Sequence, residues 1–144
     1  TDRKRMAVLA EGRPARTDAW CVARFQVADL LRLELHSGRT HQIRVHLAHI
    51  GHPVVGDPVY GAGGSRRISG SARLIAEAVE RAAGRQALHA ASLAFKHPVT
   101  EAALEFRSEW PADLRLALEL AAGDSVSVAP DEALRYLLFF NRDG

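Results

Sequence analysis

The chain has 144 residues, of which 47% are hydrophobic and 25% are charged, a size and composition typical of one globular domain. No apolar run approaches the roughly 20 residues of a membrane span and no signal-peptide pattern opens the chain, so we expect a cytoplasmic protein. A single cysteine, Cys21, excludes an internal disulfide, and its apolar surroundings predict a small core residue. The net charge of +2 does not by itself indicate nucleic acid binding.

The N-terminal segment is nevertheless basic. Its cations outnumber its acids: Arg3, Lys4, Arg5, Arg13 and Arg16 stand against Asp2 and Glu11. Such a run is usually a solvated face, and contact with phosphate is the alternative. The chain starts at Thr1 rather than at Met, so we expect a fragment or a processed product.

Two strands are expected next. Trp20, Val22 and Phe25 favour a strand over residues 17–25. Leucines at alternate positions from 31 to 35 predict a half-buried strand over residues 30–36. A turn near Ala28 and Asp29 would join the two strands into a hairpin.

A turn, a short helix and a loop follow over residues 37–61. Thr40 is the expected N-cap of the helix and Gly51 its expected end. The expected buried face is an apolar stripe made of Ile43, Leu47 and Ile50. Arg44 would lie at the edge of that stripe, where a guanidinium needs a fixed anionic partner. Arg39 in the turn would lie close to the free N–H groups of the helix start, which favour a phosphate.

The remaining elements alternate between helix and strand. A Gly- and Ser-rich basic stretch over residues 61–70 predicts an exposed, mobile loop. Further expected elements are a helix over 71–83 ended by Gly84, strands over 88–95 and 103–106, a helix over 111–122, and a short strand and helix after residue 124. Hairpins with interspersed helices predict an α+β fold with a mainly antiparallel sheet.

The run HSGRTHQIRVHLAHIGHPVVGDPVYG over residues 36–61 resembles the second signature block of the RluA-type RNA pseudouridine synthases. Weaker matches flank it in the order of that family: GRPART over 12–17, RQALHA over 85–90, LAF over 93–95 and HPVT over 97–100. The resemblance implies that residues 1–122 form the C-terminal portion of the catalytic domain. It also implies a mixed, mainly antiparallel sheet with flanking helices. Residues 123–144 are expected to form a tail with a short helix, outside the resemblance.

The resemblance implies an activity, the isomerisation of uridine to pseudouridine in rRNA or tRNA, with no metal and no organic cofactor. In the family an aspartate acts as the nucleophile and an arginine keeps it ionised and oriented; Arg44 matches that arginine. The residues implied for RNA or substrate binding are Arg39, His41, Gln42, His46, Leu88 and His89.

The chain departs from the family pattern in two respects. The His-Arg-Leu-Asp segment that carries the nucleophile and the Lys-x-Tyr strand of the pocket do not occur in it. Asp57 is expected to cap local N–H groups rather than act as the nucleophile, and Tyr60 to pack in the same loop. We therefore expect this chain alone to be inactive and to need a segment from a longer parent or a second polypeptide. Unpaired strand edges also predict self-association.

Three other interpretations remain open from the sequence. The first is a non-catalytic RNA-binding module of the same fold. The second is a metal site built from His41, His46, His49 and His52, for which no carboxylate or cysteine stands at ligand spacing. In the third, Arg44 makes only a structural ion pair.

Overall fold

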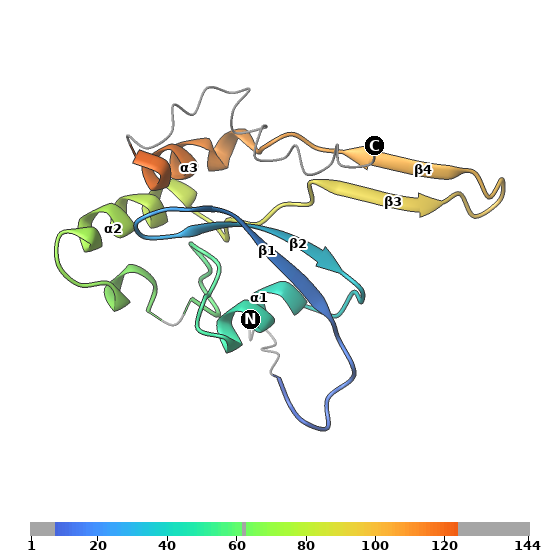
Figure 1. The fold of residues 1–144 in the computed structure, drawn as a ribbon, viewed down its shortest axis with the longest axis horizontal. Coiled ribbons are helices and arrows are strands. Elements are labelled where there is room, and N and C mark those ends of the chain that lie inside the picture. The colour runs from blue at the N-terminus through green and yellow to red at the C-terminus, as the bar shows by residue number, and fades with distance from the viewer. Residues whose placement is uncertain (1–7, 62, 124–144) are drawn as a thin grey trace.

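The computed structural model describes residues 8–61 and 63–123 (Figure 1). The elements in chain order are β1 (Thr17–Arg24), β2 (Asp29–Leu35), α1 (Gln42–His49), a 3₁₀ turn (Gly64–Arg67), α2 (Ala72–Ala83), β3 (Ser92–Lys96), β4 (Ala103–Arg107), a second 3₁₀ turn (Ala112–Leu114) and α3 (Arg115–Ala122). This confirms the predicted α+β class. Apart from Gly123, the expected tail lies outside the described residues.

The first predicted hairpin is confirmed. Strands β1 and β2 pair antiparallel, from Thr17 opposite Leu35 to Arg24 opposite Asp29, with a bulge after Cys21. The connecting turn is closed by a hydrogen bond from the Phe25 N–H to the Ala28 carbonyl. The prediction for Cys21 was wrong, because its side chain is exposed. The pattern of apolar residues predicted the strand, but it did not determine which face of the strand is buried.

The second hairpin starts later than expected. Strand β3 begins at Ser92 rather than at residue 88, because the preceding backbone curls around Arg85, which donates to the carbonyl oxygens of Gln86 and Leu88. Strands β3 and β4 pair antiparallel and form a sheet separate from that of β1 and β2. The strands are thus antiparallel as predicted, but they lie in two sheets.

The β3–β4 hairpin extends away from the helices (Figure 1). One of its faces is apolar, with Leu93 opposite Phe106 and the rings of Phe95 and Phe106 stacked at 5.9 Å. The exposed fraction is 58% for Leu93, 54% for Phe106 and 44% for Phe95. Within residues 8–61 and 63–123 this apolar face is therefore largely open.

The hydrophobic core lies between α2 and α3. Its buried side chains are Val79, Ala83, Leu114 and Ala117. The predicted end of α2 is confirmed, since Gly84 adopts φ 63° and its N–H bonds the Glu80 carbonyl, a left-handed conformation that suits glycine. The helix expected over residues 111–122 is split into a 3₁₀ turn and α3.

The loop expected over residues 61–70 is more structured than its composition indicates. It contains the 3₁₀ turn, and the Glu80 carboxylate of α2 accepts a hydrogen bond from the Ser65 N–H at 3.1 Å. Arg66 and Arg67 remain exposed. No helix in the described part of the chain combines the length and apolarity that a membrane crossing requires.

Candidate functional site

Helix α1 positions most of the predicted site residues, and its start differs from the expectation. Its N-cap is His41 with φ 55°, not Thr40, and no side chain caps the helix. The buried positions are Gln42, Val45 and Leu47, whereas Ile50 is 64% exposed. The predicted stripe was therefore wrong at Ile50. The chain turns at Gly51, with φ 84°, as expected.

Gln42 is a buried polar hub that joins the turn before α1 to the start of β1. Its Oε1 accepts hydrogen bonds from the Ser37 hydroxyl at 2.9 Å and from the Arg39 N–H at 3.0 Å. Its Nε2 donates to the Arg16 carbonyl and to the Thr17 hydroxyl, both at 2.9 Å. The residue is 6% exposed, so its side-chain amide is a buried polar group whose donors and acceptor are paired. Gln42 thus has a structural role beside the predicted one.

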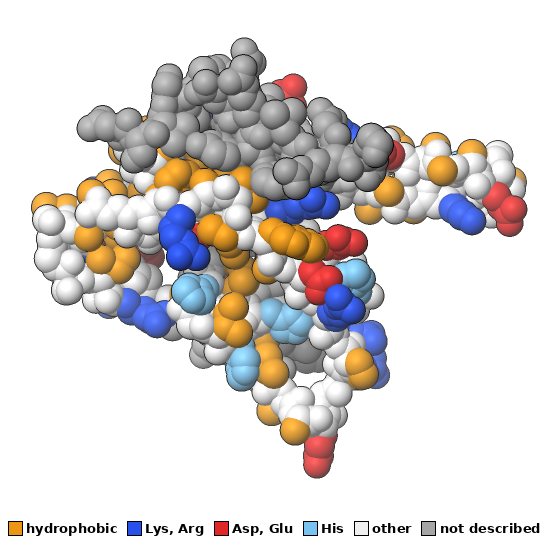
Figure 2. Space-filling view, in the orientation of Figure 1, with side chains coloured by type: hydrophobic (Ala, Val, Ile, Leu, Met, Phe, Trp, Pro, Cys, Tyr) orange, Lys and Arg blue, Asp and Glu red, His pale blue; other side chains and the backbone are white. Residues whose placement is uncertain are grey.

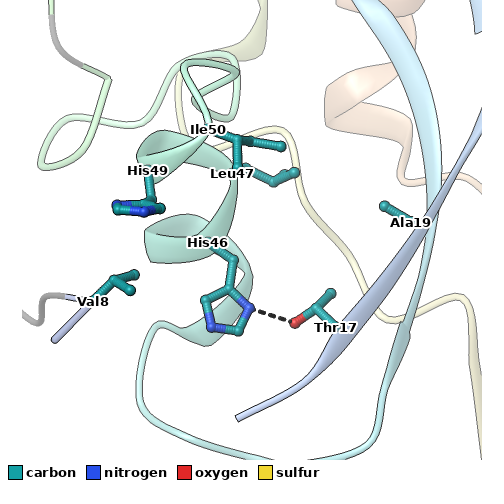
Figure 3. Close-up of a pocket in the computed structure, with 7 residues that line it drawn as sticks. All are labelled: Val8, Thr17, Ala19, His46, Leu47, His49 and Ile50. Atoms are coloured by element: carbon teal, nitrogen blue, oxygen red, sulfur yellow. Dashed lines mark hydrogen bonds between the residues drawn. The ribbon is translucent and has the colours of Figure 1, made fainter. Parts of the chain in front are cut away.

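His46 reinforces the same junction. Its Nδ1 lies 2.9 Å from the Thr17 hydroxyl, the group that also bonds Gln42 (Figure 3). Both side chains on α1 therefore hold the first residue of β1. Sequence reasoning did not single out Thr17, although it ends the first of the matched blocks.

Arg44 forms a buried ion pair within this chain. Its Nε and Nη2 donate to Asp57 Oδ2 and Oδ1 at 2.7 and 2.8 Å, a two-bond fork. The Arg44 side chain is 11% exposed and that of Asp57 is fully buried. The expected anionic partner thus exists, and among the described residues it comes from the loop 13 positions further along rather than from another polypeptide.

Asp57 also organises its own loop. Its Oδ1 accepts hydrogen bonds from the backbone N–H groups of Val59 at 2.9 Å and Tyr60 at 3.0 Å. This confirms that Asp57 caps local N–H groups. Tyr60 is 7% exposed, as expected of a packing residue, and the Arg44 guanidinium lies 5.0 Å from its ring centroid. The Tyr60 hydroxyl in turn lies 3.1 Å from His41 Nδ1.

The electrostatics of the pair follow from these contacts. Burial opposes ionisation of Asp57, but the hydrogen bonds from Arg44, Tyr60 and Val59 outweigh it and hold the pKa of the carboxyl at about 2. The same pairing raises the pKa of Arg44, against the effect of burial. Both groups are therefore charged throughout the neutral range.

Asp57 is expected to make stability depend on acid. Its folded pKa of about 2 lies below the ordinary 3.8, so its contribution is complete above that ordinary value and is lost as the pH falls through 2. Urea unfolding of wild type and Asp57→Asn at successive pH values should show an extra loss of about 2 kcal/mol in the wild type over this range. Parallel pH profiles for the two proteins would contradict the assignment.

The Asp57 loop lies against the segment that carries Leu88 and His89. The Ala87 N–H donates to the Val55 carbonyl at 2.8 Å. Gly56 adopts φ 72°, and a Cβ there would collide with the Arg85 carbonyl, so only glycine lets the two backbones approach so closely. The structure thus places the third matched block beside the second. No hydrogen bond or ion pair joins Arg44 to Leu88 or His89, and those of its guanidinium within the described residues go to Asp57.

His89 is packed rather than exposed. Its ring meets Trp110 edge to face with centroids 5.2 Å apart, and its Nδ1 and the Trp110 Nε1 are buried without a partner among the described residues. Burial lowers the pKa of His89, and the charge of Arg85 lowers it further. The side chain is therefore held neutral near pH 7.

The basic residues are only partly available to a ligand. Arg39 is exposed, in the turn before α1, whereas Arg16 forms a two-bond fork with Asp18 at 2.9 Å. Arg3, Lys4 and Arg5 lie outside the described residues. Figure 2 shows cationic and histidine side chains on the face that carries α1 and the β1–β2 hairpin, with apolar side chains between them.

A hollow of about 270 Å³ lies between α1 and β1 (Figure 3). Its lining is mostly apolar and consists of Val8, Thr17, Ala19, His46, Leu47, His49 and Ile50. The hydrogen-bonded pair of His46 and Thr17 supplies its polar part. Nothing in residues 8–61 and 63–123 groups three metal-ligating side chains, so the structure lends no support to the histidine metal site.

Comparison with known proteins agrees with the resemblance, although no family model matches the chain. The ribosomal large subunit pseudouridine synthase D of Escherichia coli (strain K12) is 44% identical to it over 124 residues, which is 86% of this chain. The chain is a homologue of the RluA-type RNA pseudouridine synthases. An RNA pseudouridine synthase of Chloroflexus aurantiacus is 46% identical over 118 residues, and the Vibrio parahaemolyticus synthase D is 40% identical over 133.

The homology covers most of this chain but a minor part of its relatives. The matched residues span 37% of the E. coli synthase D, 33% of the Chloroflexus protein and 40% of the Vibrio protein. A match over 124 of the 144 residues must include Gln42, the Arg44–Asp57 pair and the contact of the Asp57 loop with residues 85–87. These contacts therefore belong to the portion of the chain that is homologous to the synthases.

Proposed function

We propose that this chain takes part in the isomerisation of uridine to pseudouridine in rRNA or tRNA and supplies the arginine that holds the nucleophilic aspartate. Its homologues are pseudouridine synthases. In the reaction the bond from ribose C1′ to uracil N1 breaks, a bond from C1′ to C5 forms, C5 loses its proton and N1 gains one. The aspartate comes from polypeptide outside this sequence.

The observation that carries the proposal is the way Arg44 is held. A guanidinium has five N–H donors. Asp57 takes one from Nε and one from Nη2, and the end edge formed by Nη1 and Nη2 has no acceptor within residues 8–61 and 63–123. A second carboxylate can approach that edge without displacing Asp57, so a structural ion pair and a catalytic pairing are compatible on one arginine.

Asp57 is not itself suited to be the nucleophile. Its two oxygens receive four hydrogen bonds, and its side chain is fully buried. A carboxylate that is so fully engaged has a low pKa and no free path to a ribose carbon. The proposal therefore keeps the nucleophile in the missing His-Arg-Leu-Asp segment.

The test is turnover by the protein expressed from its complete reading frame. RNA labelled with tritium at C5 of uridine should release tritium to water as pseudouridine forms, without added metal or organic cofactor. Full retention of the label on rRNA and tRNA transcripts would contradict the proposal. Since the chain holds no His-Arg-Leu-Asp segment, residues 1–144 alone should release none.

The second candidate function is an RNA-binding module without catalysis. The Arg44–Asp57 pair favours it, because that pair is complete without any nucleophile. The sequence preceding Thr1 discriminates between the two: a His-Arg-Leu-Asp segment there supports the enzyme, and a reading frame without one supports the module.

Arg39 is proposed to contact RNA phosphate from the exposed turn before α1. Replacing it with alanine should weaken RNA binding and reduce the slope of log affinity against log salt by about 0.7 to 0.9, the effect of one lost phosphate contact. Filter binding at several salt concentrations measures both. Glu77→Gln, which removes a surface ion pair on α2, is the control and should change neither quantity. An unchanged slope for Arg39→Ala would place Arg39 away from the RNA.

The proposed partners are RNA and either the missing catalytic segment or a second copy of this chain. The exposed apolar side chains Leu93, Phe95 and Phe106 of the β3–β4 hairpin support association with further polypeptide. We also propose that four further residues approach the RNA or the uracil, as the resemblance implies: His41, His46, Leu88 and His89.

A further inference from the structure

Two side chains that contact Arg44 have no role in the proposed reaction: Asp57, which forms the ion pair, and Tyr60, whose ring lies beside the guanidinium and whose hydroxyl is bonded to His41. We propose that Asp57 is a positioning residue, which together with Tyr60 fixes the guanidinium of Arg44 so that its end edge meets the carboxylate of the nucleophile. This inference rests on the proposed function. It makes Asp57 the second residue of this chain, after Arg44, on which turnover depends.

The fork fixes the guanidinium within its plane. Two hydrogen bonds of 2.7 and 2.8 Å join it to Asp57, so rotation about the terminal bonds of Arg44 breaks at least one of them. The carboxylate cannot turn with it, because the N–H groups of Val59 and Tyr60 hold its Oδ1. The anchor of Arg44 is therefore tied to the backbone of the loop.

Tyr60 restrains the guanidinium on a second side. Its ring lies 5.0 Å from the guanidinium carbon, within the range of a cation–π contact. The Tyr60 hydroxyl is bonded to His41 Nδ1 at 3.1 Å, which ties the ring to the start of α1. The residue before α1 and the loop after it thus restrain the arginine that α1 carries.

Such restraint matters because catalysis depends on groups that are already oriented. An exposed arginine must lose rotamer freedom each time it meets an anion, whereas Arg44 has lost that freedom on folding. A displacement of about 1 Å can reduce a rate about 100-fold. A partner that only stabilised the fold would tolerate such a displacement as long as the charge pair remained.

The experiment compares Asp57→Glu, Asp57→Asn and the control Glu77→Gln in the protein expressed from its complete reading frame. Asp57→Glu keeps the charge pair but shifts the guanidinium by about one methylene, so kcat should fall about 100-fold with KM for RNA within about threefold. Asp57→Asn should lose at least as much of kcat. Glu77→Gln should match the wild type. All are assayed well below their melting temperatures, with circular dichroism to verify folding.

The outcomes separate the two proposals. Wild-type kcat in folded Asp57→Glu, or a loss that cooling the assay restores in step with stability, overturns the positioning role and leaves the proposed function intact. A wild-type protein without turnover, or full turnover in Arg44→Ala, overturns the proposed function and this inference with it. If Asp57→Asn does not fold, Asp57→Glu decides, because its ion pair is retained.

Discussion

Replacing Arg44 with alanine should abolish turnover in the protein expressed from its complete reading frame while leaving RNA affinity within a few-fold of wild type. The substitution removes the proposed partner of the nucleophile. It also leaves the fully buried Asp57 carboxylate without its counter-ion, which should destabilise the protein by about 3–5 kcal/mol. Tritium release, RNA binding and urea unfolding measure the three effects.

A double variant separates chemistry from stability. Arg44→Met with Asp57→Asn removes both buried charges, and the amide oxygen at position 57 can still accept from the N–H groups of Val59 and Tyr60, so no buried charge is left without its counter-ion. Its unfolding free energy should therefore return toward the wild-type value, while turnover stays below detection. Recovery of turnover together with stability would show that Arg44 is only a structural ion-pair partner.

Local patterns predicted the elements that local interactions determine. The alternation from Leu31 to Leu35 located β2, and the spacing of apolar residues up to Gly84 located α2, because both depend on residues close together in sequence. The start of β3 could not be found in this way. It is set by Arg85, whose guanidinium draws the carbonyl of Leu88 out of the expected strand.

The site shows the same division. The position of Arg44 at the edge of α1 predicted a need for an anion, which is a local argument. The anion is Asp57, and only the folded loop brings it back to α1. The sequence did hold a clue to this partner, because Asp57 is the single acidic residue between residues 35 and 76. The prediction nevertheless assigned the partner of Arg44 to another segment. The sequence predicted Thr40 as the N-cap because threonine has the better capping chemistry, whereas the structure has His41 there, in a left-handed conformation.

Gln42→Ala should be among the most damaging single substitutions to stability outside the hydrophobic core, with a loss of about 3 kcal/mol. Four hydrogen bonds disappear, and the Arg16 carbonyl and the Arg39 N–H lose the partner they have on Gln42. The control is Gln26→Ala. Gln26 is exposed in the β1–β2 turn, and its side chain makes no hydrogen bond to another described residue. Urea unfolding of both variants measures the difference.

Gln42→Glu separates the hydrogen bonds that Gln42 accepts from those that it donates. The carboxylate can still accept from the Ser37 hydroxyl and the Arg39 N–H, but it cannot donate to the Arg16 carbonyl or the Thr17 hydroxyl. An oxygen would then face an oxygen in a buried site, so this variant should be at least as unstable as Gln42→Ala at neutral pH. Recovery as the pH falls toward 4 would identify the buried charge as the cause, since a protonated carboxyl regains one donor. If Gln42→Ala and Gln26→Ala instead unfold at the same urea concentration, α1 is anchored to β1 by contacts other than this hub.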